Sequence, residues 1–252
     1  MVVTGAASGI GEATAQLLGE LGADVIGLDR NPPSVGLAQA VTVDLRDRGS
    51  IAAAVDVIGG NVDGVFNCAG LPQTEPGTDV MLAGFIGARE LTERLLPSMP
   101  AGSAVVSVSS TAAYRWRDDL AVLTEFVATA GFDDALAWGR AHLGADAANY
   151  ALTKGAVIVY TARRAVELAP RGVRVNCVAP GPTDTPMTTQ FARAVPGHMD
   201  RIPLPMGRMG AAREQAWALA FLGSPRASFI TGETLYVDGG LVAGLATGLF
   251  QR

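Results

Sequence analysis

The chain has 252 residues, of which 49% are hydrophobic and 31 are glycine, and its formal net charge is −5. This length suits one α/β domain with a single core, so residues 1–252 are expected to form one domain. The net negative charge and the absence of a cluster of Lys and Arg residues argue against nucleic acid as a partner. Turn residues interrupt every apolar stretch before the roughly 18 residues that cross a bilayer, so no membrane association is expected.

Cysteine and histidine usage narrows the possible chemistry. Cys68 and Cys177 are the only cysteines, and both lie in apolar segments, so no disulfide framework is expected. His142 and His198 do not pair with them at metal-ligand spacing, and we expect no metal site. The absence of a Gly-x-Ser-x-Gly segment argues against a serine hydrolase. The chain begins directly with an apolar strand rather than a signal peptide, which predicts a cytoplasmic protein.

Short apolar segments alternate with amphipathic ones along the whole chain. The apolar segments predict buried strands at Met1–Thr4, Asp24–Leu28, Val41–Val43, Gly64–Phe66, Ala104–Val108, Val173–Val178 and Thr234–Val237. Such alternation indicates right-handed β-α-β units with helices on both faces of a parallel sheet. We therefore expect an α/β fold, a doubly wound Rossmann-type sheet of seven parallel strands.

The first strand runs into the glycine-rich segment Thr4-Gly-Ala-Ala-Ser-Gly-Ile-Gly11, which opens a helix. Glycine suits a tight turn, a close approach of the backbone to a pyrophosphate, and close packing of the helix. Amides at the helix start would face the phosphates, and a serine hydroxyl could donate as well. The candidate dinucleotide-binding residues here are Gly5, Ser8, Gly9, Ile10 and Gly11. The alternative is an ordinary glycine-rich turn.

Acidic residues end the next two strands. Asp29 lies 18 residues beyond Gly11, where a carboxylate would accept the ribose hydroxyls and repel a 2′-phosphate, which favours NAD over NADP. Arg30 follows it and could instead attract a phosphate. Asp44 and Leu45 could flank an adenine, or Asp44 could be a solvated turn residue.

The fourth strand ends in Asn67-Cys-Ala-Gly70. Small residues at this point would leave room for a cofactor lying against the strand end, so Asn67, Ala69 and Gly70 are candidate cofactor contacts. The alternative is a simple strand terminator.

The segment between Ser110 and Tyr150 is about forty residues long. A connection of this length inside one domain is either structured or functional. We interpret residues 113–148 as an insertion of one or two helices that lies over the carboxyl edge of the sheet.

A helix follows the insertion and carries Tyr150 and Lys154 at positions i and i+4, one turn apart on one face. A cation beside a phenol would stabilise the phenolate and lower the phenol pKa, as a general acid for carbonyl reduction requires. The pair alone is weak evidence, because this spacing is common in ordinary amphipathic helices. Its position before an apolar strand and a Pro180-Gly181 turn is the layout in which open α/β sheets build their sites.

These segments together resemble the short-chain dehydrogenase/reductase family over essentially the whole chain. Thr4 to Gly11 resembles the family's cofactor loop, and Asn67 to Gly70 its Asn-Asn-Ala-Gly turn with Cys68 substituted. The resemblance implies that Ser110, Tyr150 and Lys154 are catalytic, and that Tyr150 and Lys154 also contact the cofactor. It further implies that the loop with Pro180, Gly181, Thr183 and Thr185 holds the nicotinamide carboxamide, and that Val237-Asp-Gly-Gly240 ends the closing strand.

Within the family, the chain is similar to the group of bacterial 3α-hydroxysteroid dehydrogenases/carbonyl reductases and coniferyl-alcohol dehydrogenases. The similarity lies in Cys68-Ala-Gly-Leu71 with Pro72-Gln73-Thr74, and in the long spacing from Ser110 to Tyr150. In that group the insertion is helical and alters subunit packing. The resemblance therefore implies a homo-oligomer, a homodimer or homotetramer.

One position departs from the family. Relatives have an Asn in the helix after the fourth strand, where it holds a water in a proton relay; here that position is Gly84. The departure puts the efficiency of the relay in doubt, while the acid itself is retained.

Substrate specificity should come from a lid at residues 186–208 together with the insertion. Met187, Phe191, Met199 and Met206, with Trp116 and Trp138, suggest an apolar lid for a bulky alcohol or ketone, and the alternative is that they are core and subunit contacts. The sequence thus predicts an NAD-dependent oxidoreductase that interconverts a secondary or aryl alcohol, such as a 3α-hydroxysteroid, and its carbonyl compound. The alternative is a catalytically weak dinucleotide-binding sensor or scaffold protein.

Overall fold

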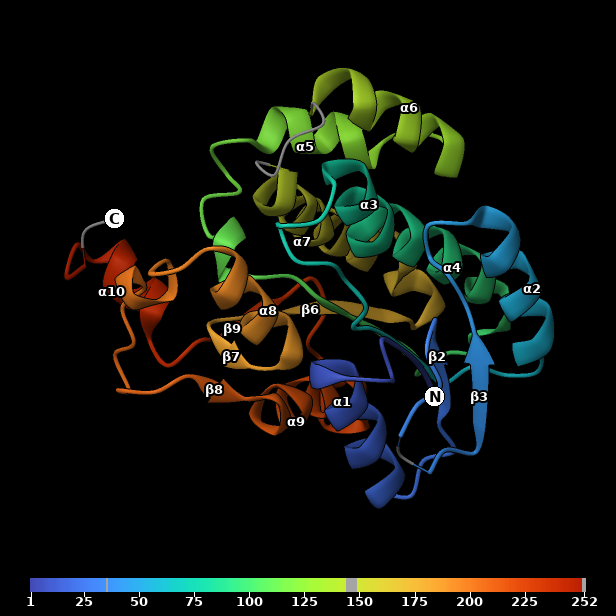
Figure 1. The fold of residues 1–252 in the computed structure, drawn as a ribbon. Helices are drawn as coiled ribbons and strands as arrows, with labels where there is room; N and C mark the ends of the chain where they lie inside the picture. The colour runs from blue at the N-terminus through green and yellow to red at the C-terminus, as the bar shows by residue number, and fades with distance from the viewer. Residues whose placement is uncertain (35, 144–148, 251–252) are drawn as a thin grey trace.

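The computed structural model describes residues 1–34, 36–143 and 149–250. Its central sheet has seven parallel strands in the order β3-β2-β1-β4-β5-β6-β9 (Figure 1). The strands are β1 (Val2–Thr4), β2 (Ile26–Asp29), β3 (Gln39–Thr42), β4 (Gly64–Asn67), β5 (Ala104–Val108), β6 (Arg174–Pro180) and β9 (Thr234–Val237). The prediction of a doubly wound sheet is confirmed, and each of the seven predicted strands overlaps an observed one.

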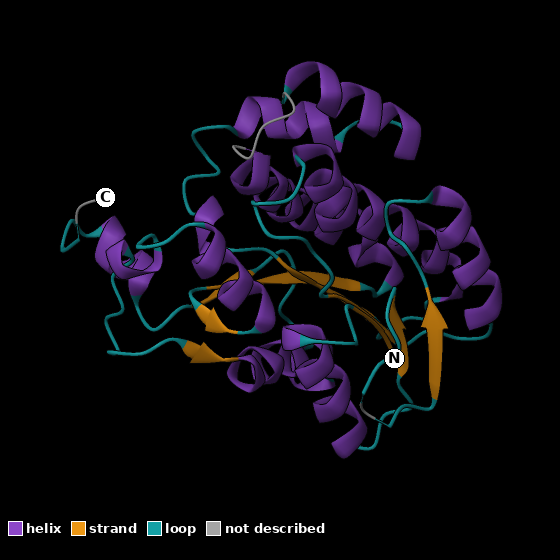
Figure 2. Cartoon of the chain, in the orientation of Figure 1, coloured by secondary structure: helices purple, strands orange, loops and turns teal. Residues whose placement is uncertain are grey.

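Helices cover both faces of the sheet, as Figure 2 shows. One face is covered by α1 (Gly9–Glu20) and α9 (Ala212–Gly223), and the other by α2 (Arg48–Ile58), α4 (Gly87–Leu95) and α7 (Asn149–Leu168). Each face has its own apolar cluster. Leu17 and Leu219 pack with Val3 and Phe66 on the first face, whereas Leu91 and Ile158 belong to the larger cluster on the second.

The strand order reverses between β1 and β4, which lie side by side with Thr4 opposite Asn67. From β1 the chain runs outward through β2 and β3, then returns and runs the other way through β4, β5 and β6. The connections that leave β1 and β4 therefore diverge and leave a crevice at the carboxyl ends of the strands. This is where the candidate residues of the sequence are brought together.

The segment between β5 and α7 contains two helices, α5 (Leu120–Val127) and α6 (Phe132–His142). They pack against α7 and against α3 (Gly77–Met81), and they form an outer layer on the helices of that face (Figure 1). The expectation that they lie over the carboxyl edge of the sheet is wrong. The reason is their apolar side chains: Phe126 and Phe132 are buried in one cluster with side chains of α7, and Trp138 stacks on Phe126 with 5.2 Å between ring centroids.

A buried arginine fixes the connection between these two helices. Arg89 of α4 is only 7% exposed, and its guanidinium donates to the carbonyl oxygens of Val127, Thr129 and Gly131 at 3.3, 3.3 and 2.7 Å. It also lies 5.4 Å from the ring centroid of Phe85. Arg89 thus donates to the last carbonyl of α5 and to two carbonyls of the loop that follows, of which Gly131 also accepts from the Ala135 amide at the start of α6.

Two short strands, β7 (Thr183–Asp184) and β8 (Gly210–Ala211), form a small parallel sheet that was not predicted. Between them lie α8 (Pro186–Ala194) and the 3-10 turn η5 (Met199–Arg201), and the chain ends after α10 (Leu241–Ala246). None of the helices in the described ranges is long and apolar enough to cross a membrane.

Candidate active site

A cavity of about 840 Å³ lies at the carboxyl ends of β1, β2, β4, β5 and β6. It is lined by most of the residues that the sequence singles out: Gly5, Ser8, Gly9, Ile10, Gly11, Asp29, Asp44, Leu45, Ala69, Gly70, Ser110, Tyr150, Lys154, Pro180, Gly181, Thr183 and Thr185. These residues come from loops far apart in the chain. The sheet therefore brings the candidate cofactor and catalytic residues to one continuous wall.

The glycine loop shapes one end of this cavity. Gly5 and Gly9 have φ angles of 71° and 61°, in the left-handed region that side chains disfavour. A Cβ at Gly11 would lie 2.2 Å from the carbonyl oxygen of Gly5, so a side chain there would separate β1 from α1. Ser8 precedes α1 without capping it through its side chain. The start of α1 therefore presents open backbone amides to the cavity, a geometry that suits an anionic phosphate.

Asp29 is held at the end of β2 by two backbone amides. Its Oδ2 accepts a hydrogen bond from the Ala7 amide at 3.1 Å, and its Oδ1 accepts one from the Asn31 amide at 3.0 Å. These bonds link the carboxylate to the glycine loop. Arg30 lines the same end of the cavity.

Asp44 has a partner that the sequence did not reveal. The Arg46 guanidinium donates to Asp44 through Nε at 3.1 Å and Nη2 at 2.8 Å, and to Asp79 through Nη1 at 2.6 Å. Hydrogen bonds from Arg46 hold the pKa of the Asp44 carboxyl below its ordinary value. Asp44 is therefore a fixed, ion-paired residue of the cavity wall rather than a solvated turn residue, and Leu45 beside it is buried.

Asn67 does not line the cavity. Its side chain is 5% exposed, and its Nδ2 donates to Thr92 Oγ1 at 2.9 Å and to Ser107 Oγ at 3.3 Å. The side chain therefore ties the end of β4 to α4 and β5. Ala69 and Gly70 follow it and do face the cavity; the amides of Cys68 and Ala69 both bond to Thr4 Oγ1 at 3.0 Å.

Ser110, Tyr150 and Lys154 lie together in the cavity wall. Ser110 follows β5, and its hydroxyl is hydrogen-bonded to the Tyr150 phenol. Lys154 lies one turn along α7, with Nζ 5.9 Å from the ring centroid of Tyr150. Nζ donates to the carbonyl oxygen of Val108 at 2.9 Å, and Ser109 Oγ donates to the carbonyl oxygen of Lys154 at 2.8 Å. The end of β5 thus fixes both ends of the lysine.

Burial changes the acidity of both groups. It raises the pKa of the Tyr150 phenol, which the hydrogen bond from Ser110 partly offsets. It lowers the pKa of the Lys154 ammonium to about 8. The expectation that Lys154 lowers the pKa of Tyr150 is wrong for this structure, because the ammonium lies over the ring and donates to Val108 rather than to the phenol oxygen.

Gly84, the departure from the family pattern, lies in a π-helical turn (Leu82–Ile86) that joins α3 to α4. A Cβ at this position would be 3.0 Å from Cγ2 of Thr153, the residue before Lys154. The Thr153 methyl thus packs closely against the helix backbone at Gly84, and a larger residue would have to displace it.

The other end of the cavity has mostly apolar lining residues beside the polar Gln190, His198 and Arg201. It is lined by Leu71 and Pro72 after β4, by Met187 and Phe191 of α8, by Met199 and Ile202, and by Leu241 and Leu245 of α10. Sequence analysis did not single out Leu241 and Leu245, although their spacing of four residues after a Gly-Gly pair indicates a helix. The cavity lining does not include Met206, Trp116 or Trp138. Both tryptophans pack against the core, which agrees with the alternative that they are core contacts rather than lid residues.

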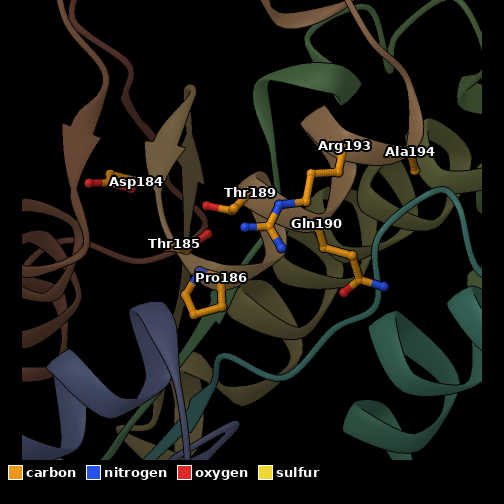
Figure 3. Close-up of a pocket in the computed structure, with 7 residues that line it drawn as sticks. All are labelled: Asp184, Thr185, Pro186, Thr189, Gln190, Arg193 and Ala194. Carbon is orange, nitrogen blue, oxygen red and sulfur yellow. The ribbon is translucent and has the colours of Figure 1, made fainter.

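A second, open pocket lies on α8. Figure 3 shows its lining residues Asp184, Thr185, Pro186, Thr189, Gln190, Arg193 and Ala194, with the Arg193 side chain lying across Thr189 and Gln190. Thr185, Pro186 and Gln190 also line the large cavity, so α8 separates the two hollows. Among the residues that the structure describes, no group of three or more His, Cys, Asp and Glu could hold a metal ion.

Lys154 is the only lysine in the sequence, so its acidity is open to direct measurement. We expect its acylation by acetic anhydride to rise with pH and level off just above pH 8, because the amine is nucleophilic only when neutral and its pKa is about 8 instead of 10.5. Mass spectrometry after proteolysis gives the extent of modification, with the amine of Met1 as internal reference. Modification that still rises steeply between pH 9 and 10 would contradict the depressed pKa.

Comparison with known proteins places this site in a family. Residues 1–122 match the family described as short chain dehydrogenase, and residues 137–242 match the one described as Enoyl-(Acyl carrier protein) reductase. The chain is 35% identical to a coniferyl-alcohol dehydrogenase of a Pseudomonas species over 245 residues, and 34% identical to a 3-alpha-hydroxysteroid dehydrogenase/carbonyl reductase of Comamonas testosteroni over 254 residues. Each alignment covers 96% of this chain and 96% of the relative.

Solved structures of related proteins have a similar fold. The crystal structure of a 3-alpha-hydroxysteroid dehydrogenase from a Pseudomonas species, complexed with NADH, superposes with a TM-score of 0.83 at 35% identity and covers 99% of both chains. A 3-ketoacyl-(acyl-carrier-protein) reductase of Brucella melitensis, also complexed with NADH, superposes with a TM-score of 0.74 at 30% identity. The chain therefore belongs to the short-chain dehydrogenase/reductase family of oxidoreductases.

Proposed function

We propose that the protein is an NAD-dependent dehydrogenase that interconverts a bulky secondary or aryl alcohol, such as a 3α-hydroxysteroid, and its carbonyl compound. The observation that carries the proposal is that Ser110, Tyr150 and Lys154 line one cavity together with the glycine loop and a group of apolar side chains. The named activities of the coniferyl-alcohol and 3-alpha-hydroxysteroid relatives support the substrate class.

The residues present fit a nicotinamide dinucleotide. Gly5, Gly9 and Gly11 keep side chains away from the start of α1, and Asp29 lies at the far end for a ribose. Pro180, Gly181, Thr183 and Thr185 would contact the nicotinamide carboxamide. The bound dinucleotide supplies or accepts the hydride; the protein's own part is to position the substrate and move a proton.

The proton chemistry follows from the cluster. Ser110 would hydrogen-bond the substrate oxygen, and Tyr150 would donate its proton to that oxygen during reduction or take it during oxidation. Because burial raises the pKa of Tyr150, the phenol stays protonated at neutral pH and serves there as the acid of carbonyl reduction. Oxidation needs the phenolate, so the oxidation rate should rise with pH. Lys154, whose Nζ faces the cavity, would bind the nicotinamide ribose.

A substrate and cofactor screen tests the proposal. The protein is assayed with NAD⁺ and NADP⁺ against steroid, aryl and aliphatic alcohols, and NADH binding is measured by fluorescence in the same preparation. We expect NAD⁺-dependent oxidation, fastest with the bulky alcohols. NADH binding without turnover of any alcohol would instead support the sensor or scaffold alternative, which the replacement of the family Asn by Gly84 favours.

Asp29 should set the cofactor preference. In Asp29→Ser, we expect the ratio of kcat/KM for NAD⁺ to that for NADP⁺ to fall by about tenfold or more, since the carboxylate that would repel a 2′-phosphate is gone and Arg30 remains; tenfold corresponds to about 1.4 kcal/mol. The matched control is Asp24→Ser, an exposed aspartate near the other end of β2 that does not line the cavity. An unchanged ratio in Asp29→Ser would assign the preference to another residue.

A further inference from the structure

The C-terminal helix α10 forms a wall of the apolar end of the cavity. Leu241 and Leu245 lie four positions apart, and therefore on one face of the helix, and both line the cavity. Leu241 is 5% exposed, whereas Leu245 is half-buried and its side chain is the more open of the two. In Figure 1 α10 lies beyond α8, on the side opposite β2 and β3, where Asp29 and Asp44 lie.

The helix is held rigidly at its start. Asp238 accepts a hydrogen bond from the Gly240 amide through Oδ1 at 2.9 Å and from the Val242 amide through Oδ2 at 2.8 Å. Asp238 also packs against Gly181, where a Cβ would lie 2.8 Å from its Cα. Gly181 is a cavity residue directly after β6, so the turn that starts α10 rests on a loop of the cavity wall.

The end of the helix and the lid are fixed in the same way. The amides of Leu249 and Phe250 donate to the carbonyl oxygen of Gly244 at 2.9 and 3.3 Å, and the Phe250 ring covers Gly244. On the other side, a Cβ at Gly239 would be 3.2 Å from Cγ of Met206, a residue of the lid. These contacts hold the segment after β9 against the cavity wall, and they fix the position of Leu245.

From this arrangement we propose that α10 is a specificity element, and that Leu245 selects bulky apolar substrates by contacting the part of the molecule distant from the reacting carbon. The inference rests on the proposed function and deepens it. On this proposal, a small ketone held at Ser110 and Tyr150 makes no contact with α10, although all of these residues line the same cavity. A tetracyclic ketone is long enough to meet both.

The test compares two ketones in two variants. The probes are 5α-androstan-3-one and cyclohexanone, with NADH at saturation. In Leu245→Ala we expect KM for the steroid to rise by about tenfold, as loss of a leucine contact implies, with cyclohexanone kinetics within twofold of the unsubstituted protein. In Leu245→Trp, which fills the end of the cavity, we expect steroid turnover to fall by at least tenfold while cyclohexanone turnover persists.

Leu249→Ala is the matched control, because Leu249 lies in the same C-terminal segment, is exposed and does not line the cavity. It should leave both ketones unchanged. Equal changes for the two ketones in the Leu245 variants, or none, would overturn the role of α10 and leave the proposed function intact. Absence of turnover of both ketones by the unsubstituted protein, with NADH binding retained, would instead reject the proposed function and this inference with it.

Discussion

Replacement of Tyr150 by Phe should lower turnover by about 10²–10⁴-fold, the range that general acid catalysis contributes, or to below detection. The substitution removes one hydroxyl from the cavity wall, and the ring still fills the space beside Lys154. NADH affinity should stay within about twofold, because the glycine loop and Asp29 are untouched. Steady-state rates with the best alcohol of the screen, and a fluorescence titration with NADH, measure both quantities.

Tyr160→Phe is a matched control for this variant. Tyr160 lies on the same helix, and its hydroxyl donates to Glu93 Oε1 at 2.6 Å, away from the cavity. Its loss should leave the rate nearly unchanged. Ser110→Ala should slow turnover by about 10²–10³-fold, as expected for a donor to the substrate oxygen. If Tyr150→Phe retained more than a tenth of the rate, the phenol would not be the acid.

Replacement of Arg89 by Met should destabilise the protein by about 3 kcal/mol, because it removes the guanidinium donor from the carbonyls of Val127 and Thr129 and one of the two donors to the carbonyl of Gly131. Methionine keeps most of the apolar stem but removes the guanidinium that lies over the Phe85 ring, so the loss reports on the hydrogen bonds together with this contact. Urea unfolding followed by circular dichroism gives the free energy of unfolding.

The comparison variant is Arg94→Met on the same helix. Arg94 is paired with Glu90 at 2.8 Å, but its side chain is 36% exposed, so we expect a cost of about 0–1 kcal/mol. Equal losses in the two variants would show that Arg89 contributes no more than a surface ion pair, and the insertion would then be held by its apolar contacts alone.

The central strands β1, β4, β5 and β6 were predictable because they are buried along their whole length and read as apolar runs bounded by turn residues, whereas the edge strands β3 and β9 are only partly buried. Val105, Val106 and Val178, for example, are all at most 1% exposed. The glycine loop and the Tyr150–Lys154 pair were equally visible, since both depend on residues close together in the chain. What the sequence could not show is which side chain meets which across long separations.

Three features of the site illustrate this. Asn67 looked like a cofactor contact, but Thr92 and Ser107, distant in sequence, turn its side chain into the core. Arg46 was not singled out, although its guanidinium fixes Asp44. The reason is that its second partner, Asp79 of α3, is distant in sequence. The acidity of Tyr150 depends on burial, and burial depends on the whole fold rather than on the spacing to Lys154.

The packing of α1 against α9 has a consequence for synthesis on the ribosome. Leu17 and Leu18 of α1 share one apolar cluster with Ala216 and Leu219 of α9, and Arg213 pairs with Glu20 across the two helices. The glycine turn and its helix emerge first, yet their covering partner is translated only near the end. A nascent chain therefore exposes the apolar face of α1 until α9 has left the ribosomal exit tunnel. A polypeptide translated from a transcript truncated before α9 should keep this face exposed and stay bound to chaperones.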